Sequence, residues 1–234
     1  PEEEAGKRKL PVRYNFSYDH IMASTEGILT RLNIDYLDVL LLHRPDPLVE
    51  PEEVAEAFAE LYESGKVRHF GVSNHSAAQM ELLSAYLDQP IATNQLEISL
   101  LHPDLLVAGT AVNQRKPEHV LRNEGTLEYC RESGITVQAW SPMAKGLLSG
   151  ADTSRRPEPV ARAAALVEEL AGEKGVSREA IVLGWLLRHP APILPVIGTT
   201  NPQRIAASAE AERVELSREE WYLLLETARG TAMP

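Results

Sequence analysis

The sequence predicts an α/β domain built on a parallel sheet, and two observations lead to this prediction. Five short apolar segments alternate with helical patterns, and no neighbouring pair of segments shows the turn signal of a hairpin. Strands without hairpins are joined by crossovers, which place them parallel in a barrel or in a doubly wound sheet. The 234 residues, 44% of them hydrophobic, suffice for one core. We therefore expect one domain over residues 1–234.

The first predicted strand is a short apolar run bounded by turn residues. The run Val39–Leu42 contains no polar position, which is typical of a strand buried on both faces. The five predicted strands are Asp38–His43, Val67–Asn74, Ile91–Glu97, Ile135–Trp140 and Ile193–Ile197.

Helices are predicted around these strands from capping residues and apolar stripes. The first begins near Asp19, with Ile21, Ile28 and Leu32 on one face and either Ser17 or Asp19 as its cap. The second begins at Pro51, carries the stripe Val54, Phe58, Leu61 and Tyr62, and ends before Gly65. Further helices are predicted to begin at or near Ser76, Thr126, Val160, Ser177, Asn201 and Ser217.

Composition and charge exclude several classes of protein. The formal net charge of -11 leaves no basic excess for binding a nucleic-acid backbone. The single cysteine, Cys130, forms no intramolecular disulfide and fits a reducing compartment, so we expect a cytoplasmic protein and a structural thiol. The sequence contains no apolar run long enough to span a membrane.

All five predicted strands end in residues that can bind a ligand. In a barrel the carboxyl ends of the strands meet on one rim, which is where this fold places its active site. Each residue also has a simpler interpretation: His43 as a structural histidine, and Ser73, Asn74 and Thr200 as turn or cap residues. The residues at the strand ends are His43, Ser73, Asn74, Gln95, Trp140, Ser141, Gly198, Thr199 and Thr200.

Four segments of the sequence strongly resemble the aldo-keto reductase family. They are Asp38–Pro45 (DVLLLHRP), Gly65–Asn74 (GKVRHFGVSN), Asn94–Glu97 (NQLE) and Ala139–Pro142 (AWSP), in the order and spacing of the family. The resemblance implies a TIM (β/α)8 barrel, of which this chain supplies about strands 4 to 8. It also implies NADP(H) as cofactor, without a Rossmann fingerprint, and hydride transfer to a small aldehyde or ketone.

The resemblance also implies roles for particular residues. Ser73, Asn74 and Gln95 would hydrogen-bond the nicotinamide carboxamide, and Trp140 would stack on its ring. His43 would donate a hydrogen bond to the carbonyl oxygen of the substrate, as a catalytic residue. The other cofactor-binding residues would be Ser141, Met143, Ala144 and Gly146 along the pyrophosphate, Gly198, Thr199 and Thr200 after the last strand, and Arg204 at the 2′-phosphate.

The sequence departs from the family pattern in three places. The family's catalytic Asp, Tyr and Lys lie on strands that have no counterpart here, and Tyr14 and Tyr18 stand in the wrong context to replace the tyrosine. Either the natural protein has an N-terminal part before Pro1, or it is a truncated member; we favour the former, because an open half-barrel exposes two strand edges. Ala207 and Ser208 stand where the family usually has Glu and Asn near the adenine, and Gly109–Asn123 resembles an insertion.

Three functions are therefore open at this stage. The first is an NADPH-dependent carbonyl reductase, and the second is a catalytically silent nucleotide-sensing or scaffolding protein of the same fold. The third, a metal-dependent hydrolase, is disfavoured because the seven histidines show no paired ligand spacing, so we expect no metal site. The oligomeric state is open between monomer and homodimer.

Overall fold

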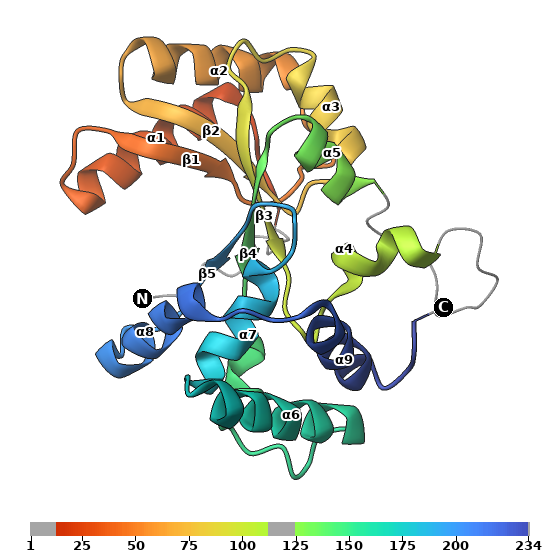
Figure 1. The fold of residues 1–234 in the computed structure, drawn as a ribbon. Helices are drawn as coiled ribbons and strands as arrows, with labels where there is room; N and C mark the ends of the chain where they lie inside the picture. Colours follow the sequence, from red (N-terminus) through yellow and green to blue (C-terminus); the bar gives the residue numbers. More distant parts are fainter. Residues whose placement is uncertain (1–12, 112–124, 234) are drawn as a thin grey trace, which may run out of the picture.

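The structure is a computed structural model that describes residues 13–111 and 125–233. At least one helix lies between each strand and the next along the described chain, as Figure 1 shows. In chain order the elements are α1 (Tyr18–Leu32), β1 (Leu37–Leu42), α2 (Pro51–Glu63), β2 (Val67–Ser73), α3 (Ala77–Ser84), β3 (Ile91–Glu97), α4 (Asp104–Val107), η1 (Ala108–Ala111), α5 (Thr126–Glu132), β4 (Thr136–Trp140), η3 (Ala144–Gly146), α6 (Glu158–Lys174), α7 (Arg178–Leu187), β5 (Ile193–Val196), α8 (Pro202–Ala209), η4 (Glu210–Arg213) and α9 (Arg218–Arg229).

The described strands form one five-stranded sheet in the order β1-β2-β3-β4-β5. All four pairings are parallel, as the sequence predicts. In the register of the sheet, Ser73 lies opposite Gln95, Gln95 opposite Gln138, and Trp140 opposite Val196. The polar carboxyl ends of neighbouring strands therefore lie along one edge of the sheet.

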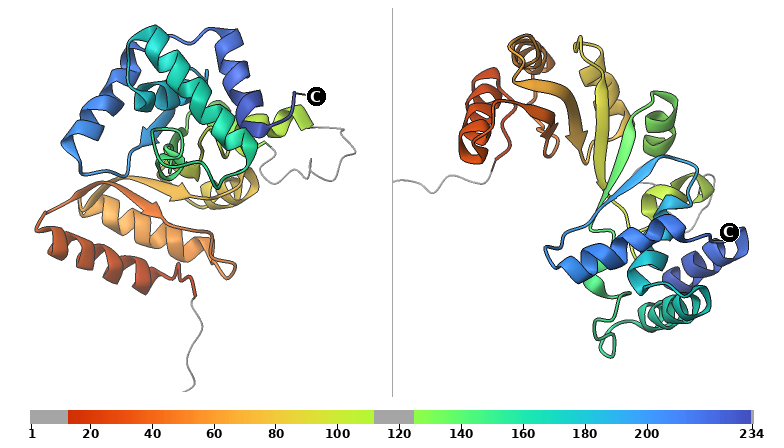
Figure 2. Two further views of the ribbon diagram at one scale, coloured as in Figure 1. Left: turned by 90° about the horizontal axis from the view of Figure 1, so that it is seen from below. Right: turned by 60° about the vertical axis from the view of Figure 1, so that its left-hand side comes forward.

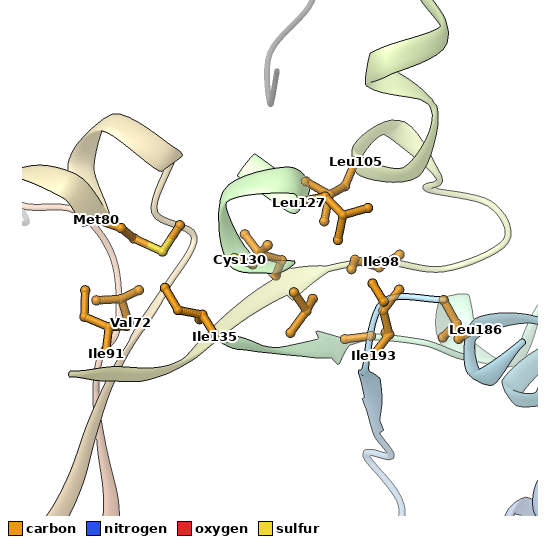
Figure 3. Packing of buried hydrophobic residues seen from close by; sticks show 14 of the residues in the cluster. Val72, Met80, Ile91, Ile98, Leu105, Leu127, Cys130, Ile135, Leu186 and Ile193 are labelled. Carbon is orange, nitrogen blue, oxygen red and sulfur yellow. The ribbon is translucent and has the colours of Figure 1, made fainter. Parts of the chain in front are cut away.

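The helices lie along the outer side of the arc that the strands form (Figure 2). The hydrophobic core fills the space between the helices and the strands. It includes Phe58 of α2, which stacks on Phe70 of β2 with ring centroids 4.0 Å apart. Figure 3 shows this packing near β3 and β4, where Ile98, Ile135 and Ile193 point toward the helices. Burial of this apolar surface is the main term that stabilises the fold.

The inner side of the arc is open in the described residues. Val39 is 40% exposed, and Leu194 and Val196 of β5 are 52% and 40% exposed. The prediction that the first strand is buried on both faces is therefore wrong for this structure. The physical reason is that no described element covers the inner face of β1.

Two predicted apolar stripes need correction. Leu32 is 59% exposed, because the buried face of α1 follows Ile21, Thr25 and Leu29, which recur every four residues. Tyr62 is 51% exposed, because Leu61 takes the last buried position of α2.

The predicted helix boundaries are confirmed where caps signalled them. The side chains of Ser17, Ser76, Ser177 and Asn201 accept hydrogen bonds from backbone N–H groups of the first turns of α1, α3, α7 and α8. Ser217 and Glu220 form the capping box of α9.

The predicted insertion Gly109–Asn123 lies outside the described residues, apart from Gly109–Ala111, which form the short helix η1. A membrane-crossing helix, which needs a long apolar segment, does not occur among the helices of the described chain.

Candidate functional site

Polar side chains from four neighbouring strands meet at the carboxyl edge of the sheet. We call His43, Ser73, Asn74, Gln95 and Trp140 the rim cluster. Hydrogen bonds link all five residues, either through side chains or through backbone carbonyls. These residues are thus brought together as the sequence predicts, although their roles stay predictions.

Asn74 lies at the centre of the rim cluster. Its backbone is left-handed, with φ 59°, a conformation that asparagine tolerates better than most residues. Its Nδ2 donates to Ser73 Oγ at 2.8 Å and to the His43 carbonyl at 3.5 Å, and its Oδ1 accepts from Trp140 Nε1 at 3.2 Å. One amide side chain therefore fixes the indole of β4 relative to the ends of β1 and β2.

Ser73 and Gln95 complete the hydrogen bonding of the cluster. Ser73 is 3% exposed, and its hydroxyl donates to the Gln95 carbonyl at 2.8 Å. Gln95 Nε2 donates to Gln138 Oε1 at 2.7 Å. Within the part of the chain that the structure describes, Gln95 Oε1 accepts no hydrogen bond, so it is free to accept one from a ligand amide.

A buried histidine supports the rim cluster from behind. His75 is 3% exposed, and its Nδ1 lies 2.9 Å from the Ser73 carbonyl. Because a carbonyl can only accept, Nδ1 must carry the proton and donate. Burial lowers the pKa of His75, and the ring stacks on Phe16 with centroids 6.3 Å apart. The neutral ring therefore holds the turn at Ser73 and Asn74 in place.

Gly71 allows β2 to approach its neighbours closely below the rim cluster. A Cβ atom at this position would lie 2.5 Å from Leu41 Cδ2 and 2.7 Å from the Thr93 carbonyl oxygen. The second contact is with backbone, which cannot move aside easily. The glycine is thus required by packing between β1, β2 and β3.

A cavity of about 450 Å³ adjoins the rim cluster. It lies between the turn after β4 and the segment after β5, and we call it the loop cavity. Of the residues predicted to bind the cofactor, Ser141, Met143, Gly146, Gly198, Thr199 and Arg204 line it. Ala144 and Thr200, which were also predicted to bind the cofactor, do not line the cavity.

The turn after β4 has an unusual backbone. Ser141, Ala144 and Lys145 have φ values of 54°, 44° and 60°, which are costly for residues other than glycine. The turn is held by its own hydrogen bonds, from the Ala144 N–H to the Ser141 carbonyl at 3.0 Å and from the Gly146 N–H to the Met143 carbonyl at 2.8 Å. Such strain persists where the surrounding structure enforces it, and it often marks a functional site.

Arg204 enters the loop cavity from the first turn of α8. The Asn201 side chain accepts from the Gln203 and Arg204 N–H groups, and Ser208 Oγ donates to the Arg204 carbonyl at 2.8 Å. The backbone of Arg204 is therefore fixed on both sides, while its side chain is exposed and can reach a ligand. The hydroxyl of Ser208, one of the two departures near the expected adenine, is already engaged within α8.

Two charged residues of the loop cavity were not identified from the sequence. Lys145 lines it from the strained turn, and Glu179 lines it from the first turn of α7. Lys145 stands between Ala144 and Gly146, two of the predicted cofactor-binding residues, so its charge could have been noticed there. No local signal points to Glu179, because only the packing of α7 beside the turn brings it to the cavity.

Other candidate chemistry finds no support in the described residues. Among them, no group of three or more His, Cys, Asp or Glu side chains could hold a metal ion. Cys130 is fully buried, and burial raises the pKa of its thiol to about 11. The thiol therefore stays protonated and unreactive at neutral pH.

Comparison with known proteins identifies the relatives of this chain. The model of the Aldo/keto reductase family matches residues 6–228. The oxidoreductase YdhF of Escherichia coli (strain K12) is 38% identical over 216 residues, which cover 92% of this chain and 65% of that protein. A 6-dehydroglucose reductase of Agrobacterium fabrum is 37% identical over 218 residues, which cover 93% of this chain and 65% of that protein.

The fold agrees with a solved structure of the same kind. The thermostable aldo-keto reductase Tm1743 superposes with a TM-score of 0.70 at 28% identity, over 91% of this chain and 67% of that chain. The predicted fold class, the α/β barrel of this family, is confirmed. The chain spans about two thirds of the length of these relatives.

Proposed function

Because the chain belongs to the aldo/keto reductase family, we propose that its protein reduces aldehyde or ketone carbonyls by hydride transfer from NADPH. The observation that carries this proposal is the position of Asn74, which ties Trp140, Ser73 and His43 into one rigid group. A flat indole beside amide groups suits a flat ring that carries a carboxamide.

The residues present fit a dinucleotide phosphate in charge and in hydrogen bonding. Lys145 and Arg204 both line the loop cavity, and a guanidinium suits a phosphate dianion because it can donate two parallel hydrogen bonds. Glu179 also lines the loop cavity and reduces its positive charge, so the phosphate groups would fit best beside Lys145 and Arg204. When bound, NADPH would supply the hydride for the reduction.

The rim cluster would hold the nicotinamide in one orientation. Gln95 Oε1 would accept a hydrogen bond from the carboxamide NH2 group. The hydrogen bond between Asn74 Nδ2 and Ser73 Oγ would be replaced in part by hydrogen bonds from these two groups to the carboxamide. Trp140 would cover one face of the ring, with its orientation fixed by Asn74. Such preorganisation fixes the position of the nicotinamide carbon that gives up the hydride before the substrate binds.

His43 would act on the substrate itself. Its side chain is exposed at the end of β1, where a carbonyl compound can reach it. A ring N–H that donates to the carbonyl oxygen stabilises the negative charge that develops there during hydride transfer.

Proton donation is assigned to no described residue. Tyr18 is unsuited to it, because its hydroxyl donates to Glu60 Oε2 at 2.5 Å and this hydrogen bond raises its pKa. A general acid needs a pKa lowered toward neutrality.

The test is NADPH oxidation by the purified protein with a panel of carbonyl compounds. The panel includes 6-dehydroglucose, the sugar in the name of the Agrobacterium relative. We expect His43→Ala to lower kcat about 100-fold to 1,000-fold, the cost of removing one oxyanion donor, while the Kd for NADPH is unchanged. The matched control is His20→Ala, an exposed histidine on α1 that should change neither value.

One outcome supports the alternative function. If the protein binds NADPH but oxidises none with any carbonyl offered, it is a nucleotide-sensing or scaffolding protein, and the proposal of catalysis is rejected.

A further inference from the structure

A groove lies in the outer helix layer, away from the rim cluster and the loop cavity. It is lined mainly by α4, by α9 and by the loop that follows α7. Helices α4 and α9 lie close together in Figure 1 and Figure 2. The groove encloses about 220 Å³ and shares no lining residue with the loop cavity. We call it the lateral groove. No function proposed above uses it.

The lateral groove has a rigid aromatic wall. Trp221 stacks on Trp185, with ring centroids 5.0 Å apart and planes 10° apart. Each indole N–H donates to the backbone carbonyl of the other tryptophan, at 2.9 and 3.1 Å. Tyr222 meets Trp221 edge-on at 5.1 Å. Because both indole donors are satisfied, the part of Trp221 that lines the groove offers a fixed apolar face.

Cationic side chains line the same groove. Arg188 and Arg218 line it, whereas none of its described lining residues is a carboxylate, in a chain whose net charge is -11. Arg188 Nε donates to the Leu216 carbonyl at 3.0 Å, which fixes the plane of the guanidinium. Its two terminal nitrogens make no hydrogen bond or ion pair with the residues that the structure describes.

His189 adds a neutral hydrogen-bond donor to the lining. Its Nδ1 accepts from the Ala191 N–H at 3.1 Å, so the neutral ring carries its proton on Nε2. Burial lowers the pKa of His189, and the charge of Arg131 acts in the same direction. The ring therefore donates without adding charge at neutral pH.

We propose that the lateral groove is a second binding site, for a small organic anion that carries a carboxylate on a flat aromatic body. The aromatic body would lie on Trp221, and the carboxylate would pair with Arg188 and Arg218. The volume of about 220 Å³ suits one or two fused rings. A purely apolar ligand would make no use of the two exposed guanidinium groups, whereas a carboxylate can accept charge-assisted hydrogen bonds from both, so the charge pattern favours the anion.

The experiment is isothermal titration calorimetry of the purified protein with 2-naphthoate and with 2-naphthamide. The two probes have almost the same shape, and only the first is charged. We expect 2-naphthoate to bind at least about tenfold more tightly than the amide, as a charge-assisted hydrogen bond would provide.

Arg218→Glu tests the position of the site. Arg218 is the first residue of α9, where an acidic side chain favours the helix, so the variant should fold. We expect it to weaken 2-naphthoate at least about tenfold. Arg155→Glu, a charge reversal at an exposed residue that lines neither the lateral groove nor the loop cavity, is the matched control and should leave the affinity unchanged.

Three outcomes would overturn the proposal. The first is no binding of 2-naphthoate up to millimolar concentration. The second is equal affinity for the acid and the amide, which rejects recognition of the charge. The third is an affinity that falls in Arg204→Gln but not in Arg218→Glu, because the probe would then occupy the loop cavity.

Discussion

The rim cluster and the loop cavity lie next to each other but are built in different ways. In the rim cluster, side chains donate and accept the hydrogen bonds that join the ends of neighbouring strands, and the Asn74 side chain alone bonds to three other residues. In the loop cavity, the shape comes from backbone: a turn with positive φ values on one side and a capped helix start on the other.

This difference indicates what each region tolerates. A site made by side chains depends on residue identity, and its geometry is lost when one partner is removed. A site made by a strained turn depends on backbone conformation, so glycine can replace a residue there without loss of shape. The following predictions test this contrast, beginning with the largest expected effect.

Asn74→Ala should have the largest effect on stability. It removes three side-chain hydrogen bonds and leaves a left-handed backbone on a residue that disfavours it. We expect the free energy of unfolding to fall by about 2–4 kcal/mol, measured by urea denaturation. Asn74→Gly relieves the backbone, so it should lose about 1 kcal/mol less.

The matched change in the loop cavity is Lys145→Gly, at φ 60°. Its free energy of unfolding should be unchanged or higher than that of the wild type, because glycine adopts this conformation without strain. If Lys145→Gly destabilises the protein as much as Asn74→Gly does, the contrast between the two regions is wrong.

Arg204→Gln should have the second largest effect, on the choice of cofactor. Removal of the guanidinium should weaken NADPH binding about 10-fold to 100-fold and leave NADH binding nearly unchanged, because only NADPH carries the 2′-phosphate. The measurement is the Kd of each cofactor from quenching of tryptophan fluorescence. Equal loss for both cofactors would place Arg204 elsewhere than at the 2′-phosphate.

The smallest expected effect is on the pH dependence of stability. It comes from His75, the buried histidine behind the rim cluster. Its pKa is lowered in the folded protein, so on acidification the unfolded chain takes up a proton first. The contribution of His75 should therefore destabilise the protein as the pH falls below about 6.5, the ordinary value, and be absent at higher pH.

Urea denaturation of the wild type and of His75→Phe at pH 7.5 and pH 5.5 measures this contribution. The variant should lose less stability between the two pH values, although His189, which is half-buried and also has a lowered pKa, should leave part of the slope. His20→Gln, at an exposed position, should keep the wild-type slope. A slope in His75→Phe equal to that of the wild type would exclude His75 as a source of the pH dependence.

Much of the fold follows from local features of the sequence. The apolar runs at Val67 and Ile91, the caps at Ser177 and Asn201 and the left-handed Gly65 act over a few residues. Such signals depend on backbone preference and on the period of apolar residues, so they can be recognised without the rest of the chain.

The burial of single residues was predicted less well. Val39, Leu32 and Tyr62 belong to apolar patterns, yet each is exposed in the described structure. A pattern indicates which face of an element is apolar, but only the neighbouring elements determine which positions on that face are covered.

The sequence by itself predicted the five strands, their parallel direction, the helices that carry caps or apolar stripes, and the polar residues at the strand ends, but not the short helices α4 and η1. Only the tertiary structure decided that Trp140 bonds to Asn74, 66 positions earlier, that Glu179 and Lys145 face one cavity, and that two arginines line an aromatic groove. The physical reason is distance along the chain. Local preferences act within a turn or a strand, whereas these contacts depend on strand register and on how helices pack, which no short segment encodes alone.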